Sequence, residues 1–440
     1  MNMRRTALVA FAALIWFGEA VFPPAAAAAY IVNSYNGSYT TEAPENYTCV
    51  SASALTHINY ILRKTTGYSH STALAWYREV RSATADFHDK YNYTRIEKGL
   101  DPRGWAWLLS NHAPVTPAYV FHDYWSSSQL TVNRRITLGI LTTRELVGVL
   151  VANGRHGVDV VGFQSNVDPL NPPYSILGFF LVDPWYPNSR ITVSGAYIGV
   201  RPNYYITASS WNTSWFTPYH DWPYRRATGR YTIWENKYVA VLRAADGSPE
   251  PTKTYDTMPP KFSDTFAIPT QKPPKSGDTE APATYPYSAY RQAVTEGIVA
   301  NNLDTSAANL GVDLQGVSVG SADQVESMAP GFPSYELVEV MKGRRVVALA
   351  YLTRVAGGFE FGGLAPVTSQ YKRANAFAAR QAFGRKGVQV ASLKLAWGWS
   401  EDTFSPFTPM WRATDTHGRP HFLTPDGNVR DRLLPPQGRG

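Results

Sequence analysis

Hydrophobic positions in the first half of the chain predict one helix and a pair of strands around a tight turn. Between residues 50 and 62, apolar side chains recur every three or four positions, which is the spacing of one helix face. The polar stretch "ENYT" precedes this segment, and Thr48 stands where a capping side chain would lie. The apolar runs 146–151 and 158–163 instead flank the sequence "NGRHG", which predicts two buried strands joined by a turn.

Further strands are predicted before residue 245. The segment "SILGFFLVDP" is apolar until Asp183, and Pro184 then prevents further strand pairing. The sequence "YTIWENKYVAVLRA", residues 231–244, predicts the last strand of this unit. Between these strands, residues 201–226 carry four Tyr, three Trp and one Phe. Two interpretations remain open: an aromatic groove for extended peptide or glycan, or a loop-rich lid packed on the sheet.

The C-terminal third has its own alternation of helices and strands. Residues 289–303 are amphipathic and predict a helix, and residues 335–367 predict a meander whose turns are "KGRR" and "AGG". Residues 369–387 predict an Ala-rich helix, and residues 409–433 predict a hairpin with turns at "THGR" and "PDGN". Strands with two helices predict a small α+β unit.

Four segments follow from this pattern, and together they give an α+β fold class. Residues 1–29 are set apart as a targeting segment, and residues 30–245 form the first domain. Residues 246–288 are rich in proline and lack an apolar period, which predicts an extended linker. Residues 289–440 form the small α+β domain, for which no function is assigned.

Composition supports two folded domains. The chain has 440 residues, of which 44% are hydrophobic and 13% aromatic, enough to build substantial cores. The formal net charge is only +7, and no run of five or six Lys and Arg residues occurs. Nucleic acid is therefore not an expected partner.

The N-terminus has the pattern of a secretory signal. Arg4 and Arg5 precede an apolar run over residues 6–17, and a stretch of alanines supplies a cleavage region at 27–29. The apolar run is shorter than a membrane span requires. We expect a secreted or cell-surface protein, with contact to a membrane only through this segment if it stays uncleaved.

Export changes the meaning of the single cysteine. Cys49 is the only cysteine in the sequence, so it cannot form an internal disulfide bond. A buried structural thiol, an intermolecular disulfide and a reactive thiol are the three roles that remain. Cys49 lies at the start of the predicted helix, where backbone N–H groups and the helix dipole favour a thiolate. The same N–H groups can stabilise an oxyanion.

A thiolate nucleophile needs a base and a group that orients the base. Of nine histidines, His156 is distinctive because it begins a predicted strand in a turn bracketed by Gly154 and Gly157. Asp183 ends the next buried-type strand and is suited to orient an imidazole. An ordinary Asp-Pro turn would also account for Asp183 and Pro184.

These three segments resemble a known family. A Cys at a helix start, then "GRHGVDVVGF", then "GFFLVDPW", is similar to the papain-like cysteine peptidases, and within them to the C39-like domains of exported bacterial proteins. The resemblance covers residues 30 to about 245 and implies a papain-like fold, with a Cys-bearing helix packed on an antiparallel sheet. It also implies that Cys49 is the nucleophile, His156 the general base and acid, and Asp183 the orienting residue.

The sequence departs from the family at two positions. The family has Gly directly after the cysteine, where this chain has Val50. The family also has a Gln about six residues before the cysteine, which donates to the oxyanion, and this chain has Ala43 there. Asn46 is the nearest side-chain amide and is the candidate replacement donor.

The resemblance and the motif search lead to two main hypotheses of function. The first is an exported cysteine hydrolase that cleaves peptide bonds or related acyl bonds through a Cys-His-Asp triad. The second is a catalytically silent relative that serves as a secreted or cell-surface binding module. A cell-wall amidase or acyl transferase is a weaker third. The sequence has no pattern for a metal site or for ATP, so we expect no cofactor. The expected partner is a peptide or protein substrate, and docking of the C-terminal domain on the first is a further hypothesis.

Overall fold

A computed structural model describes most of the chain. The described residues are 30–33, 39–41, 43, 48–63, 70–82, 99–114, 120–170, 173–185, 195–220, 232–244, 286–305, 310–329, 332–355, 357–400, 403, 405–425 and 427–433. The expected signal segment, Asn46 and nearly all of the expected linker lie outside these residues. In the part that is described, no helix has both the length and the apolar character needed to cross a membrane.

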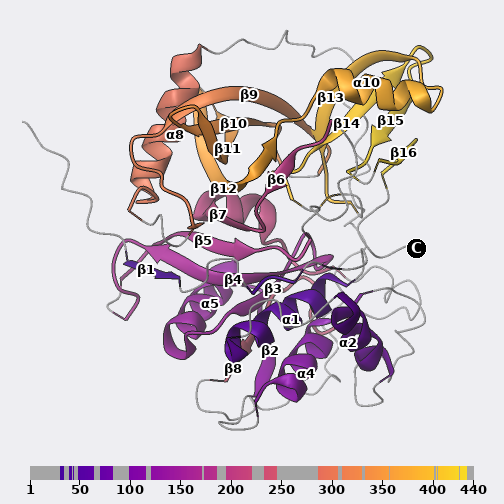
Figure 1. The fold of residues 1–440 in the computed structure, drawn as a ribbon. Coiled ribbons are helices and arrows are strands. Elements are labelled where there is room, and N and C mark those ends of the chain that lie inside the picture. The colour runs from indigo at the N-terminus through magenta and orange to yellow at the C-terminus, as the bar shows by residue number, and fades with distance from the viewer. Residues whose placement is uncertain are drawn as a thin grey trace, which may run out of the picture.

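The chain has an α+β fold built on a large, mostly antiparallel sheet (Figure 1). The N-terminal strands of this sheet occur in the spatial order β7, β5, β4, β3, β8, β2, and β1 pairs with β4. Their bounds are β1 (Tyr30–Asn33), β2 (Phe121–Ser126), β3 (Val147–Val151), β4 (His156–Ser165), β5 (Ile176–Val182), β6 (Ile198–Val200), β7 (Asn203–Thr207) and β8 (Tyr238–Arg243).

Helices cover both faces of these strands. Val147, Val149 and Val151 of β3 face α5, as alternation along a strand requires. Gly148 and Leu150 of the same strand face the opposite way, toward a second core formed with α1, α2 and α4. The helix bounds are α1 (Cys49–Leu62), α2 (His70–Ser82), α4 (Pro102–His112) and α5 (Gln129–Thr143).

The C-terminal unit confirms its predicted elements. The meander forms β10, β11 and β12, and the last hairpin is present. The predicted Ala-rich helix begins only at Ala376, because residues 369–372 extend β12, and the sequence pattern did not indicate β9 and β13. The first helix, α8, packs on β12 (Figure 1). The bounds are α8 (Tyr287–Ala300), β9 (Ser318–Ser327), β10 (Tyr335–Lys342), β11 (Arg345–Val355), β12 (Gly358–Lys372), α10 (Ala376–Arg385), β13 (Val390–Trp397), β14 (Met410–Asp415), β15 (Pro420–Leu423) and β16 (Val429–Arg430).

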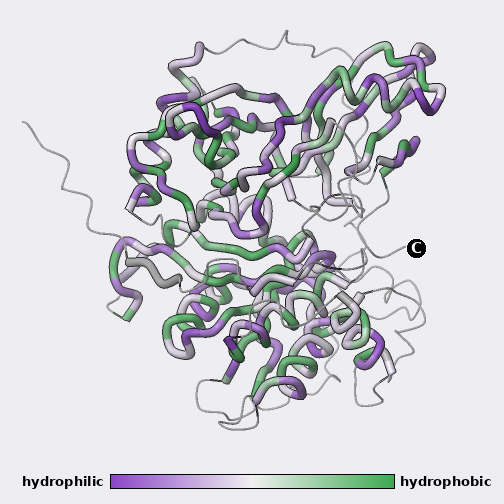
Figure 2. Tube along the Cα trace, viewed as in Figure 1, coloured by the Kyte–Doolittle hydropathy of each residue, from purple (hydrophilic) through white to green (hydrophobic). Residues whose placement is uncertain are grey.

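The two units share one sheet. Gly363 and Leu364 of β12 pair with Ile206 and Tyr205 of β7, so the strand order continues from one unit into the other. Figure 2 shows hydrophobic and polar stretches alternating along the strands and helices on both sides of this junction. One buried hydrophobic cluster holds side chains of both units, among them Tyr204 and Trp397.

Candidate functional site

Cys49 is the first residue of α1. Helix formation over Cys49–Leu62 confirms the periodicity of this segment, and Thr48 occupies the N-cap position. The Thr48 side chain makes no capping hydrogen bond, so the expectation that it caps the helix is wrong. The N–H groups of the first turn are therefore not taken up by the Thr48 hydroxyl. This is the environment that favours a thiolate and that can receive an oxyanion.

His156 begins β4 directly after a strained turn. Ala152 and Asn153 both have positive φ angles, of 53° and 61°, which non-glycine residues seldom adopt. The aromatic segment after β7 holds them there: Ala152 N–H donates to Trp215 O at 3.1 Å, and Asn153 N–H donates to Thr217 Oγ1 at 2.8 Å. The turn that carries the imidazole is thus fixed from outside its own hairpin.

Asp183 lies one residue beyond β5 and is hydrogen-bonded to His156. The distance between His156 Nε2 and Asp183 Oδ1 is 2.8 Å, and both side chains are buried. The same Oδ1 accepts the Trp185 backbone N–H at 2.8 Å, and Oδ2 accepts the Tyr204 hydroxyl at 2.9 Å. Because Asp183 engages Nε2, a hydrogen bond between the ring and Cys49 has to use Nδ1.

The electrostatics of His156 include both expected partners. Burial by itself lowers the pKa of this imidazole, but Asp183 and then Cys49 outweigh it through charge and hydrogen bonding. The pKa of His156 is raised to about 9 as a result. At neutral pH the ring is therefore protonated, which is the state that pairs with a thiolate.

Two glycines make room where the cysteine helix meets the sheet. A Cβ atom on Gly157 would lie 3.0 Å from Val50 and 3.1 Å from the ring of Trp105. A Cβ atom on Gly148 would lie 2.4 Å from the Trp105 ring. The Val50 side chain therefore packs over Gly157, next to His156 in the sequence.

A second polar pair links the same helix and strand, and the sequence pattern did not single it out. Ser53 lies one turn after Cys49, and its hydroxyl donates to Gly157 O at 3.3 Å. Asp159, on the same face of β4 as Gly157, is fully buried, and burial raises its pKa well above the ordinary value while the Ser53 hydroxyl lowers it in part. The alternation of β4 could have placed Asp159 on this face, but no pattern indicates its partner.

The remaining residues that the sequence singled out lie around or outside this site. Asn46 lies outside the described residues, so its role as oxyanion donor stays a prediction. Ala43 is buried, and its N–H donates to Pro184 O at 2.8 Å, which fixes the upstream segment beside Asp183. The described part of the aromatic segment packs inward, with Trp211, Trp215 and Phe216 almost fully buried.

Within the described ranges, no group of three His, Cys, Asp or Glu side chains is arranged to hold a metal ion. A surface cavity of about 540 Å³ lies in the C-terminal unit, lined by residues that include Lys386, Asp415 and His421. None of the three candidate residues lines that cavity, so its size does not bear on the triad.

No protein family, curated protein or solved structure matches this chain in the three comparisons made. The assignment of chemistry therefore rests on the arrangement of Cys49, His156 and Asp183 alone.

Proposed function

We propose that the chain is an exported cysteine hydrolase with a C39-like, papain-like N-terminal domain that cleaves peptide bonds or related acyl bonds. One observation carries the proposal. The His156 ring is bonded to Asp183 through Nε2 at 2.8 Å and is electrostatically coupled to Cys49 at a helix N-terminus. These three residue types, in these mutual roles, are what thiol-based acyl transfer requires.

Each residue has a defined task in the proposed reaction. The Cys49 thiolate attacks the substrate carbonyl, and the oxyanion is stabilised by N–H groups of the first turn of α1, with Asn46 as the proposed side-chain donor. His156 gives its proton to the leaving amine, and Cys49 is acylated. The imidazole then takes a proton from water, whose oxygen attacks the thioester and releases the acid and the thiolate.

A specific observation supports the alternative, a catalytically silent binding module. Cys49 is only 7% exposed, and His156 and Asp183 are 0% and 1% exposed. A substrate carbonyl must approach the sulfur within bonding distance, so the residues that cover Cys49 have to move during turnover. A chain in which they never move would keep the triad without activity.

Thiol labelling separates the two functions. At pH 6 an ordinary thiol is about 0.3% ionised, because its pKa is about 8.5. An ion-paired Cys49 is expected to react with iodoacetamide at least about tenfold faster than N-acetylcysteine at this pH. Asp183→Asn, which keeps the size of the side chain but cannot stabilise an imidazolium by charge, is expected to remove most of this advantage.

The controls are provided by the chain itself. Cys49→Ala has no thiol and must show no labelling, which attributes the signal to one position. If the native protein labels no faster than N-acetylcysteine, and hydrolyses no substrate in a mixed peptide library, the hydrolase is rejected in favour of the binding module.

A further inference from the structure

Both oxygens of Asp183 are held by separate donors. His156 and the Trp185 N–H bind Oδ1, while Oδ2 is held by the Tyr204 hydroxyl at 2.9 Å. Tyr204 lies on β7, next to β5, and is 1% exposed. Tyr204 therefore supplies the donor on Oδ2, and the imidazole and the Trp185 N–H share Oδ1.

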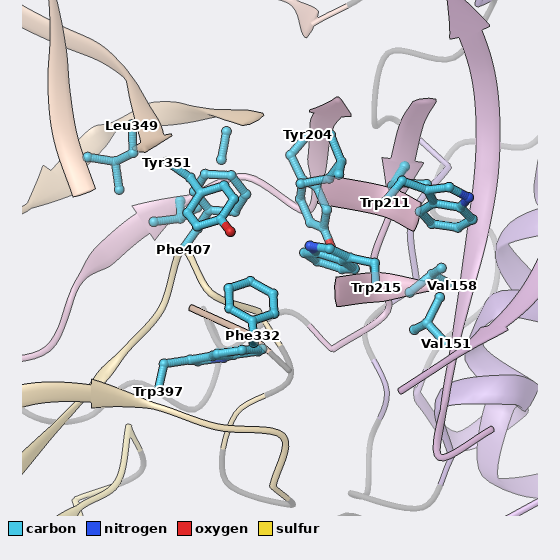
Figure 3. Close-up of a cluster of buried hydrophobic side chains, with 14 of the residues drawn as sticks. Val151, Val158, Tyr204, Trp211, Trp215, Phe332, Leu349, Tyr351, Trp397 and Phe407 are labelled. Atoms are coloured by element: carbon cyan, nitrogen blue, oxygen red, sulfur yellow. The ribbon is translucent and has the colours of Figure 1, made fainter. Parts of the chain in front are cut away.

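The ring of Tyr204 is itself clamped between two other rings. Its centroid lies 5.5 Å from that of Trp215 and 5.4 Å from that of Phe407, and both neighbours are fully buried (Figure 3). Trp215 follows β7 in the N-terminal unit. Phe407 comes from the loop between β13 and β14, so the clamp joins the two units. The described residues of this loop, 398–400, 403 and 405–409, are called the C-terminal loop.

The C-terminal loop is held in place by hydrogen bonds. The buried Thr403 hydroxyl lies within hydrogen-bond distance of the carbonyl oxygens of Ser405 and Thr408, at 3.3 and 3.0 Å. The Tyr335 hydroxyl of β10 donates to Pro406 O at 2.6 Å, directly beside Phe407. A ring fixed by these contacts can restrain its neighbour rather than follow it.

A second contact leads from the same loop to the base. Trp399 packs edge-on against Trp215, with centroids 5.5 Å apart. The Trp215 carbonyl oxygen accepts the N–H of Ala152, in the turn that ends at His156. The loop therefore reaches both members of the His–Asp pair, each through one aromatic residue.

We infer that the C-terminal loop, with Phe407 and Trp399, positions the His156–Asp183 pair through Tyr204 and Trp215. The C-terminal unit then forms part of the catalytic unit and is more than an appended binding module. Tyr204 and Phe407 are positioning residues, since neither touches the reacting atoms. This inference rests on the proposed function for its consequence in catalysis, though not for its structural content.

Tyr204→Phe tests the first link, because it removes one hydroxyl and keeps the clamped ring. The carboxylate loses its donor on Oδ2 and holds the imidazolium less firmly. Asp183 then offsets less of the effect of burial, so the pKa of His156 falls. We expect that pKa, followed by NMR titration of the imidazole, to fall from about 9 by about one unit or more. Iodoacetamide labelling of Cys49 at pH 6 is expected to slow by about tenfold.

Tyr205→Phe is the matched control. Tyr205 is the next residue on β7, is equally buried, and donates its hydroxyl to Asn301 Oδ1 at 2.8 Å instead of to Asp183. Its loss is expected to cost similar stability while the His156 titration and the labelling rate stay at the wild-type values.

Phe407→Leu tests the link to the C-terminal loop, with Phe332→Leu as its control. Phe332 is buried in the same cluster and contacts the rings of Tyr335, Tyr351 and Trp397, all within its own unit. Phe407→Leu is expected to shift the His156 titration in the same direction as Tyr204→Phe. Phe332→Leu is expected to lower the melting temperature without that shift.

The tests of the positioning role can fail independently of the tests of the proposed hydrolase. If wild-type Cys49 labels rapidly and Tyr204→Phe leaves both readouts unchanged, the positioning role is rejected and the hydrolase stands. If the wild-type protein does not label rapidly, the hydrolase falls, while the NMR titration of His156 still decides whether Tyr204 and Phe407 set the pair. If Phe407→Leu and Phe332→Leu shift the His156 titration equally, the C-terminal loop contributes only general stability and does not position the pair.

Discussion

Gly157 and Val50 explain how the chain tolerates a branched residue directly after its cysteine. Val50 is buried against β4, where Gly157 has no side chain to meet it. The missing side chain at Gly157 thereby keeps the contact between helix and strand close, at the residues that follow Cys49 and His156 in the sequence.

Gly157→Ala is expected to push α1 away from β4. The added methyl group would meet Val50 and Trp105 at 3.0 and 3.1 Å, so one of them has to shift. We expect a loss of about 1–3 kcal/mol in the free energy of unfolding, measured by urea denaturation, with slower labelling of Cys49. Gly384→Ala in α10, where no atom lies within 4 Å, is expected to be neutral or slightly stabilising.

A different result would show that Gly157 and Val50 do not set the distance between α1 and β4. If Gly157→Ala is neutral and the double variant Gly157→Ala with Val50→Gly is no better than the single one, the close approach of helix and strand does not depend on this pair. We expect the double variant to be more stable than Gly157→Ala alone, because the methyl group added at residue 157 then occupies the space left by the Val50 side chain.

At the residue scale, sequence reasoning singled out three candidate residues but missed the side chain that holds the Asp183 carboxylate. The single Cys49, the Gly-bracketed His156 and the Asp183-Pro184 strand end each left a local signal. Tyr204 left none, because nothing in "NYYIT" distinguishes it from Tyr205. The two point to opposite faces of β7, and only the packing of distant segments decides which one meets a carboxylate.

Helix α1 shows what a hydrophobic period can and cannot predict. The period located the helix correctly, but it suggested one buried face, whereas residues 49–60 are all buried. The polar positions are also enclosed, because α2, α4, β4 and the upstream segment surround the helix. Ser51, Ser53 and Thr56 find partners there: Ser51 bonds Thr48 O, Ser53 bonds Gly157 O, and Thr56 accepts from Thr41.

His57 is the buried polar residue of this helix with the clearest pH consequence. Its side chain is 0% exposed, Glu145 Oε2 lies 4.0 Å from its Nε2, and its ring meets that of Phe121 edge-on. Burial lowers the pKa of His57 from 6.5 to about 3. The unfolded chain therefore binds a proton below pH 6.5 that the folded chain refuses, and stability is lost as pH falls from 6.5 toward 3.

His57→Leu is expected to remove this part of the acid sensitivity. The difference in free energy of unfolding between variant and wild type should change by up to about 1.4 kcal/mol per pH unit below pH 6.5, in favour of the variant. Urea denaturation at several pH values measures it. A His57→Leu curve parallel to that of the wild type would mean that the folded protein admits the proton.

At the scale of the whole molecule, local patterns divided the chain more sharply than the structure does. Proline content predicted a spacer between two units, and residues 245–285 lie outside the described residues. The pairing of β12 with β7 joins segments far apart in the sequence, and no local period can report such a contact. The meander, the Ala-rich helix and the last hairpin of the C-terminal unit were predictable, whereas β9, β13 and the continuity with the N-terminal sheet were not.

That continuity predicts that the two units depend on each other. In addition to the β7–β12 pairing, Arg201 N–H donates to Pro366 O at 2.9 Å, and the Trp411 indole donates to Gly195 O at 2.8 Å. Tyr204 and Tyr205 are both fully buried at this junction. Exposing such side chains costs about 1.5–3 kcal/mol each, which is a large share of the stability of an ordinary domain.

We therefore expect residues 30–245 expressed alone to be unstable or aggregated, and residues 30–245 co-expressed with 286–440 as a separate chain to form a stable complex. Co-purification through a tag on one chain, followed by thermal melting, measures this. The complex should melt in one transition, because one sheet and one mixed core connect the units. An N-terminal fragment that melts cooperatively by itself, and labels at Cys49 as fast as the full chain, would contradict both this dependence and the positioning role of the C-terminal loop.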